Sequence, residues 1–380
     1  MNQSIPSEAD PHTAALQPGA GGRFSCFVMG TESLLIQCVG LLQGRGHTVL
    51  GVITADATIS AWAQEQGVRL VVPGPGLADR LRADPFDYFF SITNLTIIPD
   101  EILVLPAKGA INFHDGPLPH YAGLHATSWA LINQESTHGI TWHSMASEVD
   151  RGEILKQRII PISQDESAFS LNVKCYEAGI ETFGELVDEL AKGLVQPIAQ
   201  PPGDFGYFGK YQRPAAACIL DWRQPARNLL AMTRALDFGP YPNPLGLPKL
   251  LAGDQAFVVS KMQLRPATTA TPWATEPGTI TAATKDGLQV ATGEGDLLLG
   301  ELRTLTGQPL TVAEFMDQTG LHAGDQVTRL DDERASLLTR LNGRLARHES
   351  FWVGQLRQFE PFELPYASAS GTKAQQVESI

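Results

Sequence analysis

The sequence is poor in cysteine and lacks any long apolar run. Its four cysteines stand far apart among 380 residues and form no CxxC pair, which argues against a disulfide framework and against a cysteine-bound metal. No apolar stretch reaches the roughly 20 residues that a transmembrane helix needs, and the first residues lack the basic start and apolar core of a secretory signal. We therefore expect a cytoplasmic protein without a membrane partner.

Positive charge is also scarce. The chain carries 28 Lys and Arg against 41 Asp and Glu, a formal net charge of −13. A field of this sign repels polyanions and weakens the counterion release on which nucleic-acid binding depends. We expect no nucleic-acid partner.

Apolar runs typical of strands alternate with helix-like segments from Arg23 onward. The strand-like runs include FSCFVMG, HTVLGVIT, VRLVVP and FDYFFSIT, and helical periodicity lies over residues 32–43, 61–66 and 77–85. This alternation predicts a parallel sheet with helices on both faces, which binds ligands beyond the carboxyl ends of its strands. A long helical period over residues 167–192 closes this unit.

The second half of the chain has a different texture. A segment rich in Pro, Gly and aromatics, residues 193–212, is typical of a linker, and the short strand-like runs that follow predict a small barrel over residues 213–328. Residues 1–22 are expected to be a disordered leader. Residues 329–380 are expected to form an amphipathic helical segment, about 331–358, followed by a disordered polar tail.

Three polar residues stand out as candidate catalytic groups. Asn112 and His114 are two apart at the end of a strand, so their side chains point to the same side. Asp150 lies in a Val-Asp-Arg-Gly turn before another strand, and it joins them at the carboxyl edge if the two strands are neighbours. Each residue also has a plain structural interpretation, since a histidine at a strand end is often structural and Asp commonly caps such a turn.

Two cofactor hypotheses are weaker. His120, His125, His138 and His143 crowd this region, but no HExxH or similar spacing appears among them, so we expect no metal. Gly30 follows the first strand without a GxGxxG pattern, which disfavours a dinucleotide site.

The motifs INFHDGPLPHYAG and SEVDRGEIL resemble, in order and spacing, the signature of the folate-dependent formyltransferases. The layout is closest to methionyl-tRNA formyltransferase and its relatives, and ILDWRQPARNLLAMTRAL, PYPNP and PGTI are similar to their small C-terminal domain. The resemblance spans residues 23–328. It implies a Rossmann-like parallel-sheet formyltransferase domain over 23–192, a linker over 193–212 and an OB-like β-barrel subdomain over 213–328.

The resemblance also implies a mechanism and a co-substrate. Asn112 and a protonated His114 would donate to the negative oxygen of a tetrahedral intermediate, and Asp150 would favour the charged ring and relay a proton to the leaving folate nitrogen. The formyl donor would be 10-formyltetrahydrofolate. The residues expected to contact it are Ser91, Leu95, Thr96, Ile97, Ile98, Met145, Ala146 and Glu148.

The acceptor amine is indicated by the C-terminal segment. HESFWVGQLRQFEPFELPYA resembles the connection that opens the next module of a nonribosomal peptide synthetase, although an ordinary amphipathic helix would have a similar pattern. This favours an N-terminal formylation domain that acts on an aminoacyl thioester of a peptidyl carrier protein, with a synthetase module following in cis.

Three other hypotheses stay open. The acceptor is alternatively a nucleotide-linked amino sugar or, with less support, initiator methionyl-tRNA, because residues 53–73 hold one Arg and two acids instead of a basic insertion. The third hypothesis is a folate-binding or docking module without turnover.

Asp115 departs from the family pattern, and it either contacts the acceptor ammonium or caps the loop.

Overall fold

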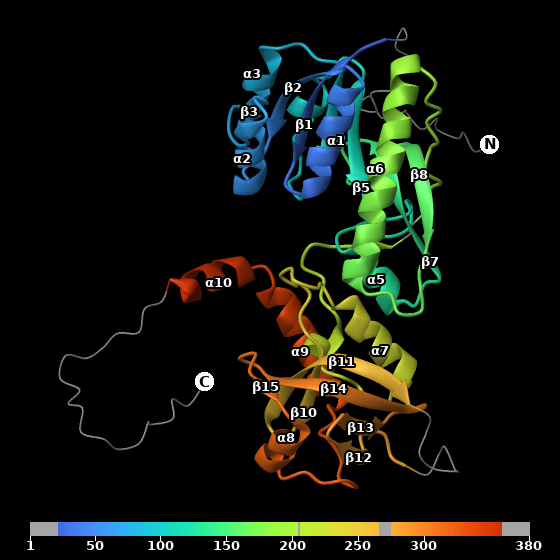
Figure 1. The fold of residues 1–380 in the computed structure, drawn as a ribbon, viewed down its shortest axis with the longest axis vertical. Coiled ribbons are helices and arrows are strands. Elements are labelled where there is room, and N and C mark those ends of the chain that lie inside the picture. Colours follow the sequence, from blue (N-terminus) through green and yellow to red (C-terminus); the bar gives the residue numbers. More distant parts are fainter. Residues whose placement is uncertain (1–21, 204–205, 266–274, 359–380) are drawn as a thin grey trace, which may run out of the picture.

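The computed structural model describes residues 22–203, 206–265 and 275–358 of the chain. The expected leader, apart from its last residue, and the expected tail beyond residue 358 lie outside this described part. Figure 1 shows an N-terminal sheet unit above a smaller C-terminal unit, which further helical segments follow.

A seven-stranded sheet forms the first unit, in the order β3-β2-β1-β4-β5-β7-β8. The strands are β1 Ser25–Gly30, β2 Thr48–Ile53, β3 Leu70–Val71, β4 Tyr88–Ile92, β5 Gly109–His114, β7 Thr137–Ser144 and β8 Ile154–Pro161. The first five are parallel, which confirms the predicted α/β sheet. The last two are antiparallel, so the sheet is mixed and mainly parallel. The chain between β7 and β8 is too short for a parallel crossover, so the two strands form a hairpin.

Helices cover both faces of this sheet, as predicted. They are α1 Ser33–Gly44, α2 Ala57–Glu65, α3 Leu77–Arg82, α4 Asp100–Leu103, α5 Ala126–Ile132 and α6 Ala168–Lys192. Side chains alternate along β1, so Cys26 and Val28 join the core with α1 and α6, whereas Phe27 and Met29 join the core with α3 and α4. Parallel strands buried on both faces are expected to be apolar throughout.

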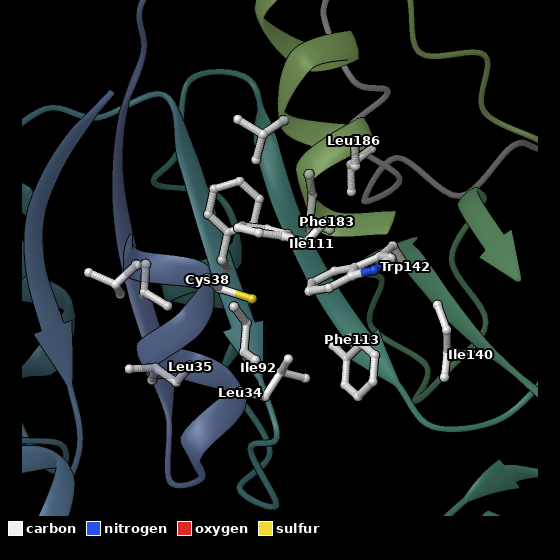
Figure 2. Close-up of a cluster of buried hydrophobic side chains, with 14 of the residues drawn as sticks. Leu34, Leu35, Cys38, Ile92, Ile111, Phe113, Ile140, Trp142, Phe183 and Leu186 are labelled. Carbon is white, nitrogen blue, oxygen red and sulfur yellow. The ribbon is translucent and has the colours of Figure 1, made fainter. Parts of the chain in front are cut away.

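The long helix α6 has clear sequence signals at both ends. The Ser167 side chain accepts from the backbone N–H of Ser170, completing a capping box, and Gly193 ends the helix in a left-handed conformation. Its buried side packs Phe183 against Trp142 of β7, with ring centroids 4.8 Å apart (Figure 2). The Trp142 indole N–H also donates to Thr182 at 3.0 Å. The long helix therefore lies where the periodicity predicted it.

The predicted linker takes part in the fold. Within it, β9 Tyr207–Phe208 pairs in parallel with β6 Ala122–Gly123, a short strand in the loop after β5. The Phe208 ring stacks on Tyr121 and on Trp129 at centroid distances of 5.4 and 5.0 Å. The segment is thus tied to the loop that follows the candidate catalytic strand.

The C-terminal unit is an antiparallel half-barrel, as predicted. Its strands are β10 Lys249–Ala252, β11 Gln255–Arg265, β12 Ile280–Thr284, β13 Gly287–Ala291, β14 Asp296–Thr304 and β15 Pro309–Leu310. A short helix η1 Ala215–Cys218 precedes it, and α7 Ala226–Ala235 and α8 Val312–Thr319 complete it around an apolar core. The predicted amphipathic segment is two helices, α9 Asp332–Leu345 and α10 Glu349–Arg357.

The two units meet through an apolar cluster of their own. It joins Trp129 and Ala126 of α5 to Cys218, Leu236 and Leu245. Within the described ranges, none of the helices combines the length and apolar character needed to cross a membrane.

Candidate active site

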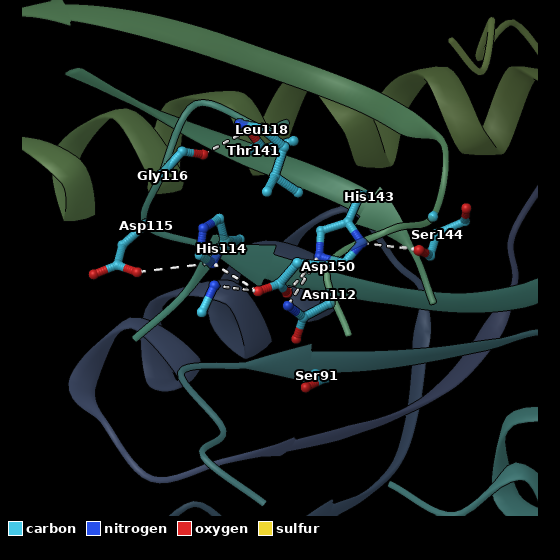
Figure 3. A network of polar contacts seen from close by, with 12 residues as sticks. Ser91, Asn112, His114, Asp115, Gly116, Leu118, Thr141, His143, Ser144 and Asp150 are labelled. Carbon is cyan, nitrogen blue, oxygen red and sulfur yellow. Dashed lines mark hydrogen bonds and ion pairs between the residues drawn. The ribbon is translucent and has the colours of Figure 1, made fainter. Parts of the chain in front are cut away.

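Strand β5 presents two of the candidate residues on one face of the sheet. Ile111 and Phe113 point into the core beneath α1 and α6, so Asn112 and His114 lie on the opposite face. In register, Asn112 is paired with Ser91 of β4 on one side and with His143 of β7 on the other. Figure 3 shows these side chains gathered around Asp150.

Asp150 reaches this face from the turn between β7 and β8. The predicted condition, that its strand neighbours β5, is not met, because β7 lies between them. The residue has a left-handed backbone, with φ +57°, and is 8% exposed. Its Oδ2 accepts from the Gly123 backbone N–H at 2.8 Å and lies 3.7 Å from His114 Nδ1, and its Oδ1 lies 3.5 Å from His143 Nε2. The three predicted residues are therefore brought together by a turn.

The surroundings of Asp150 stabilise its negative charge. Burial by itself would raise the pKa of this carboxyl, but the charge of His114, the contacts of His143 and the hydrogen bond from Gly123 hold the pKa well below its usual value. A carboxyl group in this state carries no proton near pH 7. Its contribution is a fixed negative charge between two imidazole rings.

The His114 ring is held from both sides. Its Nε2 lies 2.8 Å from the Tyr121 carbonyl oxygen, which only accepts, so Nε2 is the donor. The ring leaves no room for a side chain at Gly116, where a Cβ would lie 2.6 Å from Nε2. The other nitrogen, Nδ1, faces Asp150 and lies 3.9 Å from Asp115. Nε2 is therefore already used by the Tyr121 carbonyl, and Nδ1 is the nitrogen that faces the site.

His143 belongs to the same cluster, and the sequence analysis did not assign it a role. Its Nδ1 donates to the Ser144 carbonyl at 2.8 Å, which turns Nε2 towards the Asn112 amide nitrogen, 3.1 Å away. Alternation along the β7 sequence places Thr141 and His143 on one face and Trp142 on the other. This alternation could have indicated in the sequence that His143 and Thr141 share a face. It places His143 beside Asn112 only when the antiparallel register of β7 with β5 is known.

Two further histidines, His125 and His138, lie near the loop that follows β5. His138 is buried, and its Nε2 donates to the Asp115 carbonyl at 2.7 Å. His125 begins α5 with a left-handed backbone. Burial lowers the pKa of both His125 and His138. In the part of the chain that the structure describes, no three His, Cys, Asp or Glu residues are grouped so as to hold a metal ion.

The predicted folate contacts after β4 fall into two classes. Ser91 is buried at the end of β4, and Ile98 is buried in the core with α3 and α4. Between them, Leu95 and Ile97 are 64% and 79% exposed on a loop that also exposes Thr96. The Asn94 side chain bonds to both the N–H and the carbonyl of Thr96, at 3.1 and 2.8 Å, which fixes this loop.

The second predicted group follows β7. Met145 is half-buried, and its N–H donates to the Ala110 carbonyl of β5 at 2.8 Å. Ala146 is half-buried and Glu148 is exposed in the chain leading to Asp150. Both predicted groups thus flank β5, one after each of its neighbouring strands.

Two family models match the chain in consecutive segments. The model described as Formyl transferase matches residues 75–187, and the one described as Formyl transferase, C-terminal domain, matches residues 214–320. The first contains Asn112, His114 and Asp150.

Curated and solved relatives agree with these matches. The methionyl-tRNA formyltransferase of Trichlorobacter lovleyi is 29% identical over 242 residues, covering 64% of this chain and 72% of that protein. Among solved structures, WlaRD, a sugar 3N-formyl transferase crystallised with dTDP and 5-N-formyl-THF, has a TM-score of 0.57 at 16% identity, covering 75% of this chain and 99% of that one. An N-formyltransferase from Helicobacter canadensis, in complex with folinic acid and dTDP-3-aminofucose, has a TM-score of 0.57 at 15% identity, with 73% and 98% covered.

Proposed function

Because the chain belongs to the formyl transferase family, both of whose domain models it matches, we propose that it formylates an aminoacyl thioester on a peptidyl carrier protein, with 10-formyltetrahydrofolate as the donor. Folate-dependent formyl transfer is the activity of the chain. The nature of the donor and acceptor is the proposed part. The observation that carries the chemistry is the buried cluster of Asn112, His114, His143 and Asp150 on one sheet face.

The cluster is suited to a reaction in which negative charge develops on oxygen. An amine that attacks the formyl carbon creates a tetrahedral intermediate with charge on the former carbonyl oxygen. The Asn112 amide has two N–H groups; one donates to His143 Nε2, and the second serves the intermediate. Donors fixed before the reaction stabilise this charge without rearrangement, and losing one typically costs about a hundredfold to a thousandfold in turnover.

The proton for the leaving folate nitrogen is assigned to His114. Asp150 is held ionised, so it places a negative charge beside the His114 ring and donates no proton itself. The 3.7 Å separation of His114 Nδ1 from Asp150 exceeds hydrogen-bond length, so the Nδ1–H is not tied to that carboxylate. The same group then stabilises the intermediate and delivers its proton to the folate nitrogen as the carbon–nitrogen bond to folate breaks, and the proton that the attacking amine loses returns to His114.

The loop after β4 supports the folate assignment. Leu95 and Ile97 expose large apolar side chains on a loop fixed by Asn94, next to the strand that carries Asn112. Exposed apolar side chains held in a fixed loop suit the flat face of a pterin. Ser91, paired with Asn112 across the strands, is a predicted polar contact beside the strand that carries Asn112.

Helices α9 and α10 support a carrier-bound acceptor. Leu337, Leu341 and Leu345 are spaced by four residues and are 45%, 41% and 63% exposed, so they form an unpartnered apolar stripe on α9. Arg340 and Arg344 are exposed beside it. Residues 332–358, which contain both helices, hold five Arg and three acids within a chain of net charge −13, so this locally basic surface suits a partner with an acidic, partly apolar face.

The sugar-nucleotide alternative retains specific support. Both solved relatives described above were crystallised with a dTDP compound. In this chain, β1 ends in a single glycine, Gly30, whose added Cβ would lie 1.9 Å from the Ile92 carbonyl oxygen, so the glycine is explained by close packing. The methionyl-tRNA alternative is supported by the curated relative.

One competition experiment separates these acceptors. The protein is incubated with 10-formyltetrahydrofolate and, in turn, an aminoacyl carrier protein, a nucleotide-linked amino sugar and initiator methionyl-tRNA, and each product is weighed by intact mass spectrometry. We expect rapid formylation of the aminoacyl carrier. Rapid formylation of the sugar nucleotide with none of the carrier would overturn the proposed acceptor.

A charge-reversal pair tests the docking surface. Arg340→Glu with Arg344→Glu is expected to raise the KM for the carrier about tenfold or more, because like charges facing an acidic partner repel it. Lys285→Glu is the control, because Lys285 is exposed on the hairpin between β12 and β13 and its substitution reverses one charge, as each member of the pair does. This variant is expected to leave the KM for the carrier unchanged. Equal KM in the pair and the wild type would exclude α9 as the docking surface.

A further inference from the structure

Residues 193–212, called the connector below, link the two units in the sequence. Within its described residues, 193–203 and 206–212, the connector runs beside the Asp150 turn. Near their start, Ile198 and Ile154 exchange two backbone hydrogen bonds, at 2.8 and 2.9 Å, beside the first residue of β8. Further on, Arg151 donates to the Gly203 carbonyl at 3.3 Å. The connector therefore follows the turn instead of crossing open solvent.

Gln200 holds the backbone of this turn. Its side-chain Nε2 donates to the carbonyl oxygens of Asp150 and Gly152, at 2.8 and 2.7 Å. Asp150 has a left-handed backbone that a residue with a side chain adopts only at a cost. Gly152 is packed so closely that a Cβ would lie 1.7 Å from the Ser144 carbonyl oxygen. A side chain with two donors on one nitrogen fits two carbonyls that converge in this way.

The other end of the connector holds the partner of the Asp150 carboxylate. Phe208 of β9 pairs with Gly123, and its carbonyl accepts from the Leu124 N–H at 2.8 Å. A Cβ at Gly123 would lie 2.2 Å from the Phe208 carbonyl oxygen. The Gly123 N–H donates to Asp150 Oδ2, so the strand pairing fixes the direction of that donor.

We infer that the connector is part of the active site and that Gln200 is a positioning residue for formyl transfer. Gln200 fixes the main chain of Asp150, and β9 fixes the Gly123 N–H that donates to the Asp150 carboxylate. The negative charge of that carboxylate therefore stays between His114 and His143. The inference rests on the proposed function in one respect, because its kinetic test measures formyl transfer. Its structural content, that Gln200 keeps the Gly123–Asp150 hydrogen bond closed, is independent of the acceptor.

Three variants isolate this role. Gln200→Ala removes the side chain, whereas Gln200→Met keeps its length and apolar packing and removes both donors. Gln196→Ala is the matched control, because Gln196 lies in the same connector and is exposed. All three are expected to melt within a few degrees of the wild type, since Gln200 contacts a turn and contributes little to either apolar core.

Two measurements are made on the full-length variants. Hydrogen exchange of the Gly123 amide, followed by NMR without any substrate, is expected to accelerate at least tenfold in both Gln200 variants and to stay unchanged in Gln196→Ala. With 10-formyltetrahydrofolate and the acceptor that the competition experiment identifies, kcat is expected to fall at least tenfold in both variants. The KM for the folate is expected to change less than twofold.

Three results would contradict the inference. Wild-type exchange of Gly123 in Gln200→Ala would overturn the inference whichever acceptor is used. Wild-type kcat in Gln200→Met would overturn it as well, because the side chain would then act by packing and not by its two hydrogen bonds. A rise in the folate KM with unchanged kcat would assign Gln200 to binding and contradict a positioning role.

Discussion

The two faces of the β5–β7 strand pair differ sharply although they are built from alternate residues of the same short segments. On the face beneath α6, Ile111, Phe113, Ile140 and Trp142 are buried among apolar side chains (Figure 2). On the opposite face, Asn112, His114, Thr141 and His143 form polar contacts with one another and with the loops (Figure 3). One face stabilises the fold and the other carries the chemistry.

The difference shows how a reversal of strand direction helps to build a site. The parallel strands β1 and β4 are buried on both faces, and their residues are almost entirely apolar. The β7–β8 hairpin leaves a turn that folds back over the polar face and delivers Asp150. The predictions below perturb the two faces separately, in order of decreasing effect.

The largest effect is expected on the apolar face. Phe183→Ala removes a fully buried ring that packs on Phe90 and Trp142, and truncating such a ring costs about 3–5 kcal/mol of unfolding free energy. Turnover per folded molecule should stay near the wild-type value, because Phe183 lies on the other side of the sheet. Urea unfolding and an activity assay at a temperature where the variant remains folded check both halves. A large loss of turnover in fully folded protein would show that the faces are coupled.

A smaller energetic effect, but a larger loss of activity, is expected on the polar face. Asp150→Asn removes the negative charge between His114 and His143 while keeping the shape, so turnover should fall about a hundredfold, or about 2.7 kcal/mol. The melting temperature should change far less than in Phe183→Ala. Asp115→Asn is the comparison for the second carboxylate, which is 3.9 Å from His114 and more exposed. Equal losses in the two variants would contradict a special position for Asp150.

Acidification tests His138, which lies in β7 on the face of Ile140 and Trp142 and bonds to the loop after β5. Burial lowers the pKa of His138 below the ordinary value of about 6.5, so the unfolded chain binds the proton first as the pH falls. The stability linked to this residue is present above about pH 6.5 and is lost below it, by about 1.4 kcal/mol for each unit by which the pKa is lowered. His138→Gln, which keeps a donor for the Asp115 carbonyl, should lose less stability between pH 7 and pH 5.5. Parallel curves for both proteins would contradict this.

The smallest effect is expected from metal removal. The chemistry assigned to the polar face uses side-chain donors and one carboxylate, so prolonged treatment with a chelator should leave turnover unchanged. Metal analysis of the purified protein accompanies the assay. Stoichiometric zinc that is lost together with activity would restore the histidine-cluster hypothesis.

Much of this arrangement follows from local sequence. The strand-helix alternation predicted the parallel strands, and two-residue spacing placed Asn112 and His114 on one side. The position of His143 could not be predicted, because its pairing with Asn112 depends on the antiparallel register between β5 and β7. Gln200 lies 50 residues after Asp150 in a segment with the composition of a linker. Contacts of this kind depend on the path of the chain and leave no local pattern.

The most direct test of the assigned chemistry is the turnover of His114→Ala, measured as formyl transfer from 10-formyltetrahydrofolate with folding monitored by thermal melting. The ring lies at a strand end and contacts the Tyr121 carbonyl and two carboxylates, so its removal should leave the melting temperature nearly unchanged. Turnover should fall by about a hundredfold or more, as expected for a lost donor at a developing charge. Near-normal turnover in the folded variant would contradict the account of the polar face.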